Sequence, residues 1–178
     1  MENCIKQILA SQISNKVRMK TILKITLICC FCISFTHCKY DKFRPPKSNL
    51  TDRQLYDSCK NNASLVYYKN DSVTIHSGDN GPHGAFKLKF NKIAALALTD
   101  GGKLPIGNVF PDGSLIVKEV QSNGLLAFMY KHKSFWLWGE ANADGSTVFS
   151  IDSDPTTACV NCHSQNGERD LAVSFHHY

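Results

Sequence analysis

The residues best suited to chemistry lie near the C-terminal end, where the segment 159–163 reads CVNCH. Cys159 and Cys162 are three positions apart, and His163 follows the second thiol directly. This spacing suits covalent haem attachment. The two thiols reach the two vinyl groups, while the histidine lies beneath the iron as an axial ligand. The segment therefore predicts one covalently bound haem c, with Asp154, Thr156 or Thr157 as the cap of a short helix that carries it.

Two other sites use the same pair of cysteines. A redox Cys-x-x-Cys motif opens a helix inside a βαβ unit, whereas the surrounding pattern here indicates antiparallel strands. A structural zinc site needs four ligands, and only the isolated residues Cys59, His76 or His83 are available to complete it. Both alternatives remain open, and the haem interpretation is favoured.

The N-terminal region has the composition of an export signal. From Met19, two lysines precede an apolar stretch that is too short for a membrane span. We therefore predict a signal peptide over 19–37. Residues 1–18 are polar and are interpreted as an upstream extension, with Met19 as the expected start.

Cys38 follows this apolar stretch at the position of an acylated lipoprotein cysteine. Acyl chains on Cys38 would anchor the exported chain, because each buried methylene contributes about 0.8 kcal/mol. Residues 38–50 are charged and contain Pro45 and Pro46, as expected of a short tether. Cleavage after Ser34 would instead give a soluble periplasmic protein. In either case the expected location is the periplasmic side of a bacterial membrane, which suits c-type haem because that group is attached outside the cytoplasm.

The charge distribution argues against a nucleic-acid partner. The chain of 178 residues has a net charge of +5. Residues 1–37 contribute +4 of this, and the remaining 141 residues carry only +1. A nucleic-acid footprint should lie on the folded domain, so we do not expect nucleic-acid binding. The hydrophobic content of 43% is enough for a core.

The elements that must position the haem motif are mostly β. Leu50 to Asn61 predicts a short helix with Thr51 as its cap and with Leu55 and Cys59 on one face. A second short helix is expected over 91–102. Apolar and β-branched runs predict strands over 64–69, 72–76, 84–90, 110–120, 124–131, 134–141 and 146–151, with a hairpin-like break at Asn70-Asp71. The predicted fold is mainly β (α+β): an antiparallel sheet with short helices and a C-terminal haem-attachment helix.

Three segments resemble the cytochrome P-460 family. They are FPDGSLIVKEV (110–120), SFWLWGEANADG (134–145) and ACVNCHSQNGERDLAVSF (158–175). The family consists of exported mono-haem c-type cytochromes with a mostly β fold and a haem motif near the C-terminus. The resemblance spans 51–178, which we interpret as one haem domain.

The resemblance implies a role for four residues. Cys159 and Cys162 match the cysteines that form thioethers with the haem, and His163 matches the axial ligand of the iron. Lys118 matches the lysine that bonds covalently to a meso carbon of the haem in family members. It is the candidate catalytic residue of this chain.

The strand pattern supports Lys118 independently. In an extended strand Ile116, Lys118 and Val120 share one face, which is otherwise apolar. A buried lysine favours its neutral form, and only the free amine is a nucleophile. Without the resemblance, the ordinary interpretation is a strand lysine whose head reaches water or pairs with a carboxylate.

The distal side of the haem is less defined by the sequence. Hydroxylamine-oxidising members use a distal carboxylate as proton acceptor, and Glu140 is the nearest candidate, although a surface position at the strand end is the favoured interpretation. Phe128 or Phe135 could form an apolar distal wall. Met129, His76 and His83 are candidate sixth ligands of the iron.

Together these patterns predict an exported haem oxidoreductase that binds or oxidises hydroxylamine or nitric oxide. The alternative is a non-catalytic haem protein that transfers electrons or binds and senses a gas. The expected partners are the small nitrogenous ligand, a redox cytochrome, a membrane through the lipid anchor and a second copy of the chain.

Overall fold

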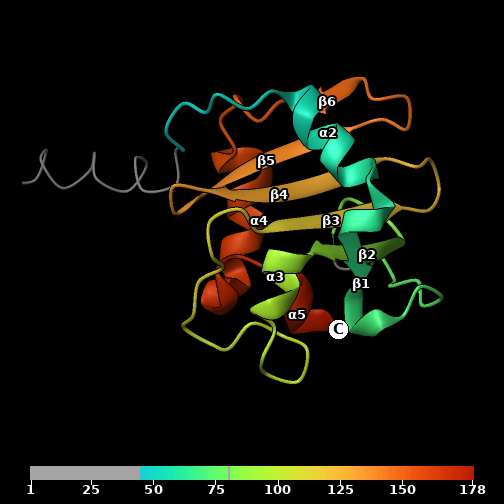
Figure 1. Ribbon diagram of the computed structural model, residues 1–178, viewed down its shortest axis with the longest axis vertical. Helices are drawn as coiled ribbons and strands as arrows, with labels where there is room; N and C mark the ends of the chain where they lie inside the picture. Colours follow the sequence, from blue (N-terminus) through green and yellow to red (C-terminus); the bar gives the residue numbers. More distant parts are fainter. Residues whose placement is uncertain (1–44, 80) are drawn as a thin grey trace, which may run out of the picture. The chain divides into compact units, whose positions relative to one another are not determined.

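A six-stranded antiparallel sheet lies at the centre of the computed structural model, which describes residues 45–79 and 81–178 (Figure 1). The strands are β1 (Leu65–Tyr67), β2 (Phe86–Asn91), β3 (Leu115–Val120), β4 (Leu126–His132), β5 (Phe135–Ala141) and β6 (Thr147–Phe149). Each strand pairs with the next one along the chain, so the sheet is a meander. The predicted mainly β architecture is confirmed.

Short helices flank this sheet. They are α2 (Asp52–Lys60), α3 (Lys92–Leu96), α4 (Asn161–His163) and α5 (Ser174–His177). A π-helical turn (Thr156–Val160) runs directly into α4, and a 3-10 segment (Ser164–Arg169) follows it. Two further 3-10 turns, Asn62–Ser64 and Tyr68–Asn70, lie on either side of β1.

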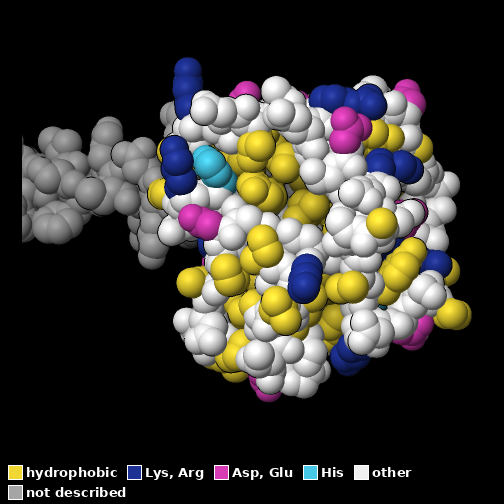
Figure 2. Space-filling model, viewed as in Figure 1, with side chains coloured by type: hydrophobic (Ala, Val, Ile, Leu, Met, Phe, Trp, Pro, Cys, Tyr) yellow, Lys and Arg dark blue, Asp and Glu magenta, His cyan; other side chains and the backbone are white. Residues whose placement is uncertain are grey.

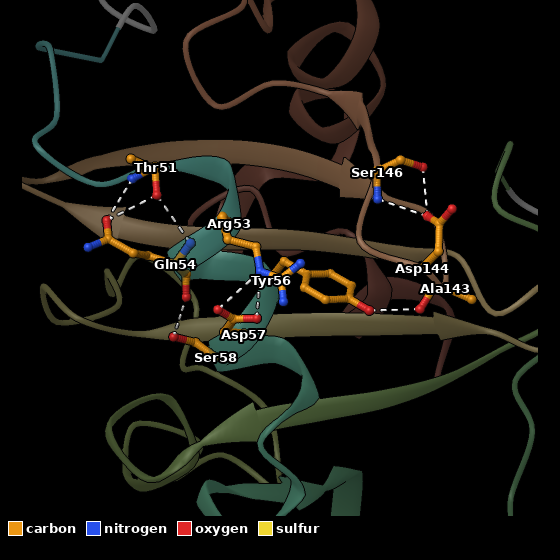
Figure 3. Close-up of polar contacts among 9 residues, drawn as sticks. All are labelled: Thr51, Arg53, Gln54, Tyr56, Asp57, Ser58, Ala143, Asp144 and Ser146. Carbon is orange, nitrogen blue, oxygen red and sulfur yellow. Dashed lines mark hydrogen bonds and ion pairs between the residues drawn. The ribbon is translucent and has the colours of Figure 1, made fainter.

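Thr51 caps helix α2, as predicted. The Thr51 hydroxyl accepts a hydrogen bond from the backbone N–H of Gln54 (3.2 Å), and the Gln54 side chain accepts one from the backbone N–H of Thr51 (2.9 Å; Figure 3). This reciprocal capping box satisfies two N–H groups at the start of the helix. Farther along, the Tyr56 hydroxyl donates to the carbonyl of Ala143 (2.7 Å) and ties α2 to the β5–β6 connection.

The two faces of the sheet are covered by different parts of the chain. The α2 face is the face that α2 covers, and the C-terminal face is the one that residues 155–178 cover (Figure 1). Side chains alternate between the faces because a strand has a period of two. The buried sheet residues of the α2 face include Leu115, Val117, Leu126, Phe128 and Leu137. Those of the C-terminal face include Phe86, Leu88, Phe90, Ile116, Met129, Trp136 and Trp138.

The predicted strand over 72–76 and its hairpin break are wrong. Lys69 and Asn70 both have positive φ (51° and 57°), which ends the extended chain after β1. The Asp71 carboxylate then accepts two backbone N–H bonds from the residues that follow, so the chain turns locally instead of pairing. Only His76 forms a bridge, with the first residue of β2. As a result, β2 pairs with β1.

The second predicted helix is shorter than expected. The helix predicted over 91–102 ends at Leu96, although Asn91 caps it by accepting from the backbone N–H of Ala94 (3.0 Å). Apolar side chains of α3 and of the loop after it lie on the surface, where Figure 2 shows hydrophobic atoms gathered. The exposed ones are Ile93, Leu96, Ile106 and Val109. They do not line the cavity described below.

The predictions for the N-terminal region lie outside the described residues. These are the extension 1–18, the signal peptide 19–37, the lipidation at Cys38 and the tether up to residue 44. In the part of the chain that the structure describes, no helix has the length and apolar character needed to cross a membrane.

Candidate functional site

A cavity of about 840 Å³, including the space at its open mouth, lies between the sheet and the C-terminal segment. The sheet contributes mostly apolar side chains, together with Lys118 and Glu140. From the C-terminal segment come Cys159, Cys162, His163, Ala172 and Phe175, among others. The structure therefore brings the predicted haem-motif residues and Lys118 to one cavity.

Local helix geometry presents the three motif residues together. Positions three and four apart lie on one side of a helix, so Cys162 and His163 both lie on the side of Cys159. The first of these residues belongs to the π-helical turn, and π-helical turns are frequent at functional sites. The Asp154 carboxylate accepts from the backbone N–H and from the hydroxyl of Thr156 (2.9 and 2.6 Å). The N-cap position of the turn is Pro155, which has no side-chain cap, so Asp154 contacts the start of the turn but is not its predicted cap.

His163 is held as a neutral imidazole with a defined tautomer. Its Nδ1 lies 2.7 Å from the carbonyl oxygen of Leu171, and because a carbonyl only accepts, Nδ1 carries the proton. The ring packs edge-on against Trp138 at a centroid distance of 4.6 Å. Burial lowers the pKa of His163 to about 4, with smaller contributions from Lys118 and His83. The unprotonated Nε2 is therefore the ring nitrogen able to bind a metal.

Cys159 is a half-buried thiol. Burial, and to a smaller extent the Glu140 carboxylate, raise the pKa of Cys159 to about 12. A redox cysteine has a lowered pKa instead. The six described strands are also all antiparallel, so they contain no βαβ unit. Both observations disfavour the redox Cys-x-x-Cys interpretation.

The zinc interpretation also lacks support. Across residues 45–79 and 81–178, no group of three or more His, Cys, Asp or Glu side chains could hold a metal ion. Cys59, one of the residues that might have completed such a site, is buried on the α2 face and packs as a small hydrophobe. Burial raises its pKa to about 12. The sheet separates this thiol from the cavity.

Lys118 lies on the cavity side of β3, opposite Leu88 of β2 and Ala127 of β4. Its Nζ lies 4.7 Å from the centre of the Phe86 ring. Among the described residues, no carboxylate is within ion-pair distance of this Nζ. Burial lowers the pKa of Lys118 to about 8, so a useful fraction is free amine near neutral pH. The predicted apolar strand face is confirmed, with Ile116 and Val120 both buried.

Glu140 also lines the cavity, which corrects the favoured interpretation of a surface residue at the strand end. It is half-buried, and burial raises its pKa. The reason is register: Glu140 of β5 pairs with Ala127 of β4, which pairs with Lys118 of β3, so all three share the C-terminal face. The alternation of side chains along β5 could have indicated this position, because Glu140 is two residues after Trp138 and therefore shares its face.

His83 lies beside Glu140 in the cavity wall. Its Nδ1 is 3.6 Å from a Glu140 carboxylate oxygen, a distance too long for a hydrogen bond. Burial, followed by the charge of Lys118, lowers the pKa of His83 to about 4. His83 is therefore neutral at neutral pH, and its contact with Glu140 is not an ion pair there.

The remaining candidates divide between the cavity and the rest of the fold. Met129 and Phe128 border the cavity, although the Phe128 side chain packs in the core of the α2 face; Phe135 does not border the cavity. His76 lies outside it, with its ring 4.6 Å from the Tyr178 ring and 5.6 Å from the Phe86 ring. Among the proposed sixth ligands, the structure thus retains Met129 and His83 beside the cavity.

Comparison of the chain with protein-family profiles, with curated proteins and with solved structures gives no match. The chemistry that this chain can perform is therefore inferred from its cavity. Its apolar walls would exclude water, its two thiols could form covalent bonds, and its neutral imidazole could bind a metal. An amine and a carboxylate are also available within it, so the cavity suits a large, flat, apolar group and small-molecule chemistry beside that group.

Proposed function

We propose that the chain is an exported mono-haem c-type cytochrome, similar to the cytochrome P-460 family, which oxidises or binds a small nitrogenous ligand. One observation carries the proposal. The two thiols of the haem motif and its neutral histidine line the same apolar cavity, and the Nδ1–H of that histidine is already bound to a carbonyl. A covalent haem needs all of these features at once.

Three residues would hold the haem. Cys159 and Cys162 would each add across a vinyl group, so that a carbon–sulfur bond forms and the thiol hydrogen moves to the adjacent carbon. His163 would bind the iron through Nε2, since Leu171 occupies Nδ1. When bound, haem c would supply one-electron chemistry and an iron site for a small ligand.

Glu140 and Lys118 would act on the ligand side. The Glu140 carboxylate, with its pKa raised by burial, suits the acceptance of protons from hydroxylamine. Lys118, as an amine without a carboxylate partner among the described residues, would contact the haem edge. A covalent bond from Lys118 to the porphyrin replaces one N–H and one C–H, so it requires a two-electron oxidant from solution, such as a peroxide.

The proposed setting follows from the N-terminal pattern. Export through the signal peptide 19–37 and acylation at Cys38 would hold the haem domain on the periplasmic side of a bacterial membrane. A redox cytochrome would be the electron acceptor there.

A second function is favoured by the same cavity lining. Met129 and His83 both border the cavity, and a thioether or imidazole at the sixth position would block substrate. The protein would then transfer electrons or sense a gas. The ferrous absorption spectrum, with and without added nitric oxide, distinguishes an open sixth position from an occupied one.

The test of the haem proposal is covalent attachment. The full chain, expressed with export and haem-attachment machinery, should keep its haem stain on a denaturing gel. The stain should be lost when Cys159 and Cys162 are both replaced by Ala. Cys59→Ala is the matched control and should keep it, because Cys59 lies on the α2 face. A mature wild type with free thiols and no stain would refute the proposal.

The catalytic part has its own test. Glu140→Gln should lower the rate of hydroxylamine oxidation by about 10²–10⁴-fold, the usual contribution of a general base, with the haem stain unchanged. Peptide mapping of the wild type should recover the peptide that contains Lys118 attached to the haem peptide. In Lys118→Arg the peptide that contains position 118 should be separate from the haem peptide. An unchanged rate in Glu140→Gln would favour the second function.

A further inference from the structure

We propose that a buried ion pair between Lys131 and Asp170 positions the carbonyl that binds His163, and so tunes this histidine as an axial ligand. Neither residue lines the cavity. Asp170 is directed into the protein, whereas the preceding Arg169 pairs with Asp100 (2.8 Å). The role of His163 as iron ligand rests on the function proposed above.

The ion pair is almost fully buried, with side-chain exposures of 4% for Lys131 and 10% for Asp170. The Lys131 Nζ donates to both carboxylate oxygens (2.9 and 2.8 Å). One of these oxygens also accepts from the backbone N–H of Phe110 (2.8 Å). A buried charge pair is retained only with good geometry and further hydrogen bonds, and this pair has both.

The pair holds an unfavourable backbone conformation in place. Asp170 and the following Leu171 both have positive φ (54° and 65°). This conformation is uncommon for residues other than glycine, and for leucine more so than for aspartate. The Trp136 indole N–H fixes the turn further by donating to the carbonyl of Asp170 (2.8 Å). Residues in such conformations persist only when the surrounding structure over-determines them, and they cluster at functional sites.

The backbone conformation of Asp170 and Leu171 determines a contact with His163. The carbonyl next along the chain, that of Leu171, accepts the Nδ1–H of His163 at 2.7 Å. A hydrogen bond from the second ring nitrogen of a metal-binding histidine fixes its tautomer and raises its basicity as a ligand. Lys131 and Asp170 are therefore positioning residues: they act on the iron through Leu171 and His163.

The first test measures the reduction potential of the haem-loaded protein. If the network is lost, the Leu171 carbonyl holds Nδ1–H less firmly, the imidazole becomes a weaker donor, and the potential rises. Asp170→Asn and Lys131→Met should both raise it. Direct electrostatics would move the two variants in opposite directions, because one loses a negative charge and the other a positive one. Asn also tolerates positive φ, so Asp170→Asn keeps the turn accessible.

Lys89→Met is the matched control. Lys89 is also a buried strand lysine, paired with Glu119 (2.5 Å), but it lies on the α2 face. The Lys89→Met variant should lose stability, as Lys131→Met does, but its haem should keep the wild-type reduction potential. The proposal is overturned if both test variants fold and keep the wild-type potential, or if Lys89→Met shifts the potential as much as they do.

A second measurement does not depend on haem. In the full chain without haem, ¹⁵N NMR of the His163 ring should show the Nδ1–H tautomer as the main form in the wild type and a mixture of tautomers in Asp170→Asn. If the wild type binds no haem, the proposed function fails, and this measurement still decides the positioning role. Identical tautomer populations in wild type and variant would refute that role.

Discussion

Two lysines of adjacent strands, one on each face of the sheet, have opposite surroundings. Lys89 of β2 lies on the α2 face, is 3% exposed, and is bonded to Glu119 (2.5 Å) and to Asn62 (3.0 Å). Lys118 of the adjacent strand lies on the C-terminal face, where the described residues provide it with no carboxylate. The strand pattern placed Lys118 on an otherwise apolar face with Ile116 and Val120, but it gave no sign that Lys89 is buried against a carboxylate.

This difference accompanies a second one, between a face that is filled by side chains and a face that keeps a cavity. On the α2 face, apolar side chains fill the space between sheet and helix, and the buried charge is neutralised. On the C-terminal face a cavity remains, and its ionisable groups have shifted pKa values. Ionisable groups perturbed by burial within a cleft are typical of functional sites.

Packing gives the largest expected contrast between the faces. Leu137→Ala on the α2 face should lower the free energy of unfolding by about 3–4 kcal/mol, because it leaves a closed void in a filled core. Met129→Ala on the C-terminal face should lower it by about 2 kcal/mol, since the space it vacates joins an existing cavity. Denaturant unfolding of the two variants measures both values. Equal losses would mean that the C-terminal face is as tightly packed as the other.

Replacement of each of the two lysines by Met gives the next largest contrast in stability. Lys89→Met should lower the free energy of unfolding by about 2–3 kcal/mol, less than for a fully buried pair because the Glu119 side chain is 34% exposed. Lys118→Met should leave it unchanged or raise it by about 1 kcal/mol at pH 7, because a desolvated charge without a carboxylate is removed. A loss in Lys118→Met as large as that in Lys89→Met would contradict the distinction between the faces.

The pH dependence of stability gives the smallest effect, but it can be assigned to a single residue, Lys118. In the folded chain the pKa of Lys118 is about 8, below its ordinary value of 10.5. Between these values the unfolded chain binds more protons, so the free energy of unfolding should rise with pH.

For the haem-free wild type, this rise should be about 1–2 kcal/mol greater than for Lys118→Met, after allowance for solvent screening. Thermal unfolding from pH 7 to 10.5 measures the difference. Parallel profiles for the two proteins would show that Lys118 titrates as an ordinary lysine.

Much of the local structure followed from the sequence. The alternation of Phe86, Leu88 and Phe90 predicted β2, and Thr51 predicted the start of α2, because both signals involve residues only a few positions apart. The CVNCH motif likewise predicted that Cys159, Cys162 and His163 lie together on a short helical segment. Short-range geometry determines all of these features, so no knowledge of the remaining chain was needed.

Contacts between distant residues were decided by the tertiary structure. Alternation groups Glu140 with Trp138, but only the pairing of β5 with β4 and the C-terminal cover make their shared face the wall of a cavity. Lys131 and Asp170 are 39 residues apart, and nothing local in either segment indicates the other. The two-residue period of a strand determines which of its side chains share a face. The segment that covers this face and the charged residues that pair there depend on how the whole chain packs.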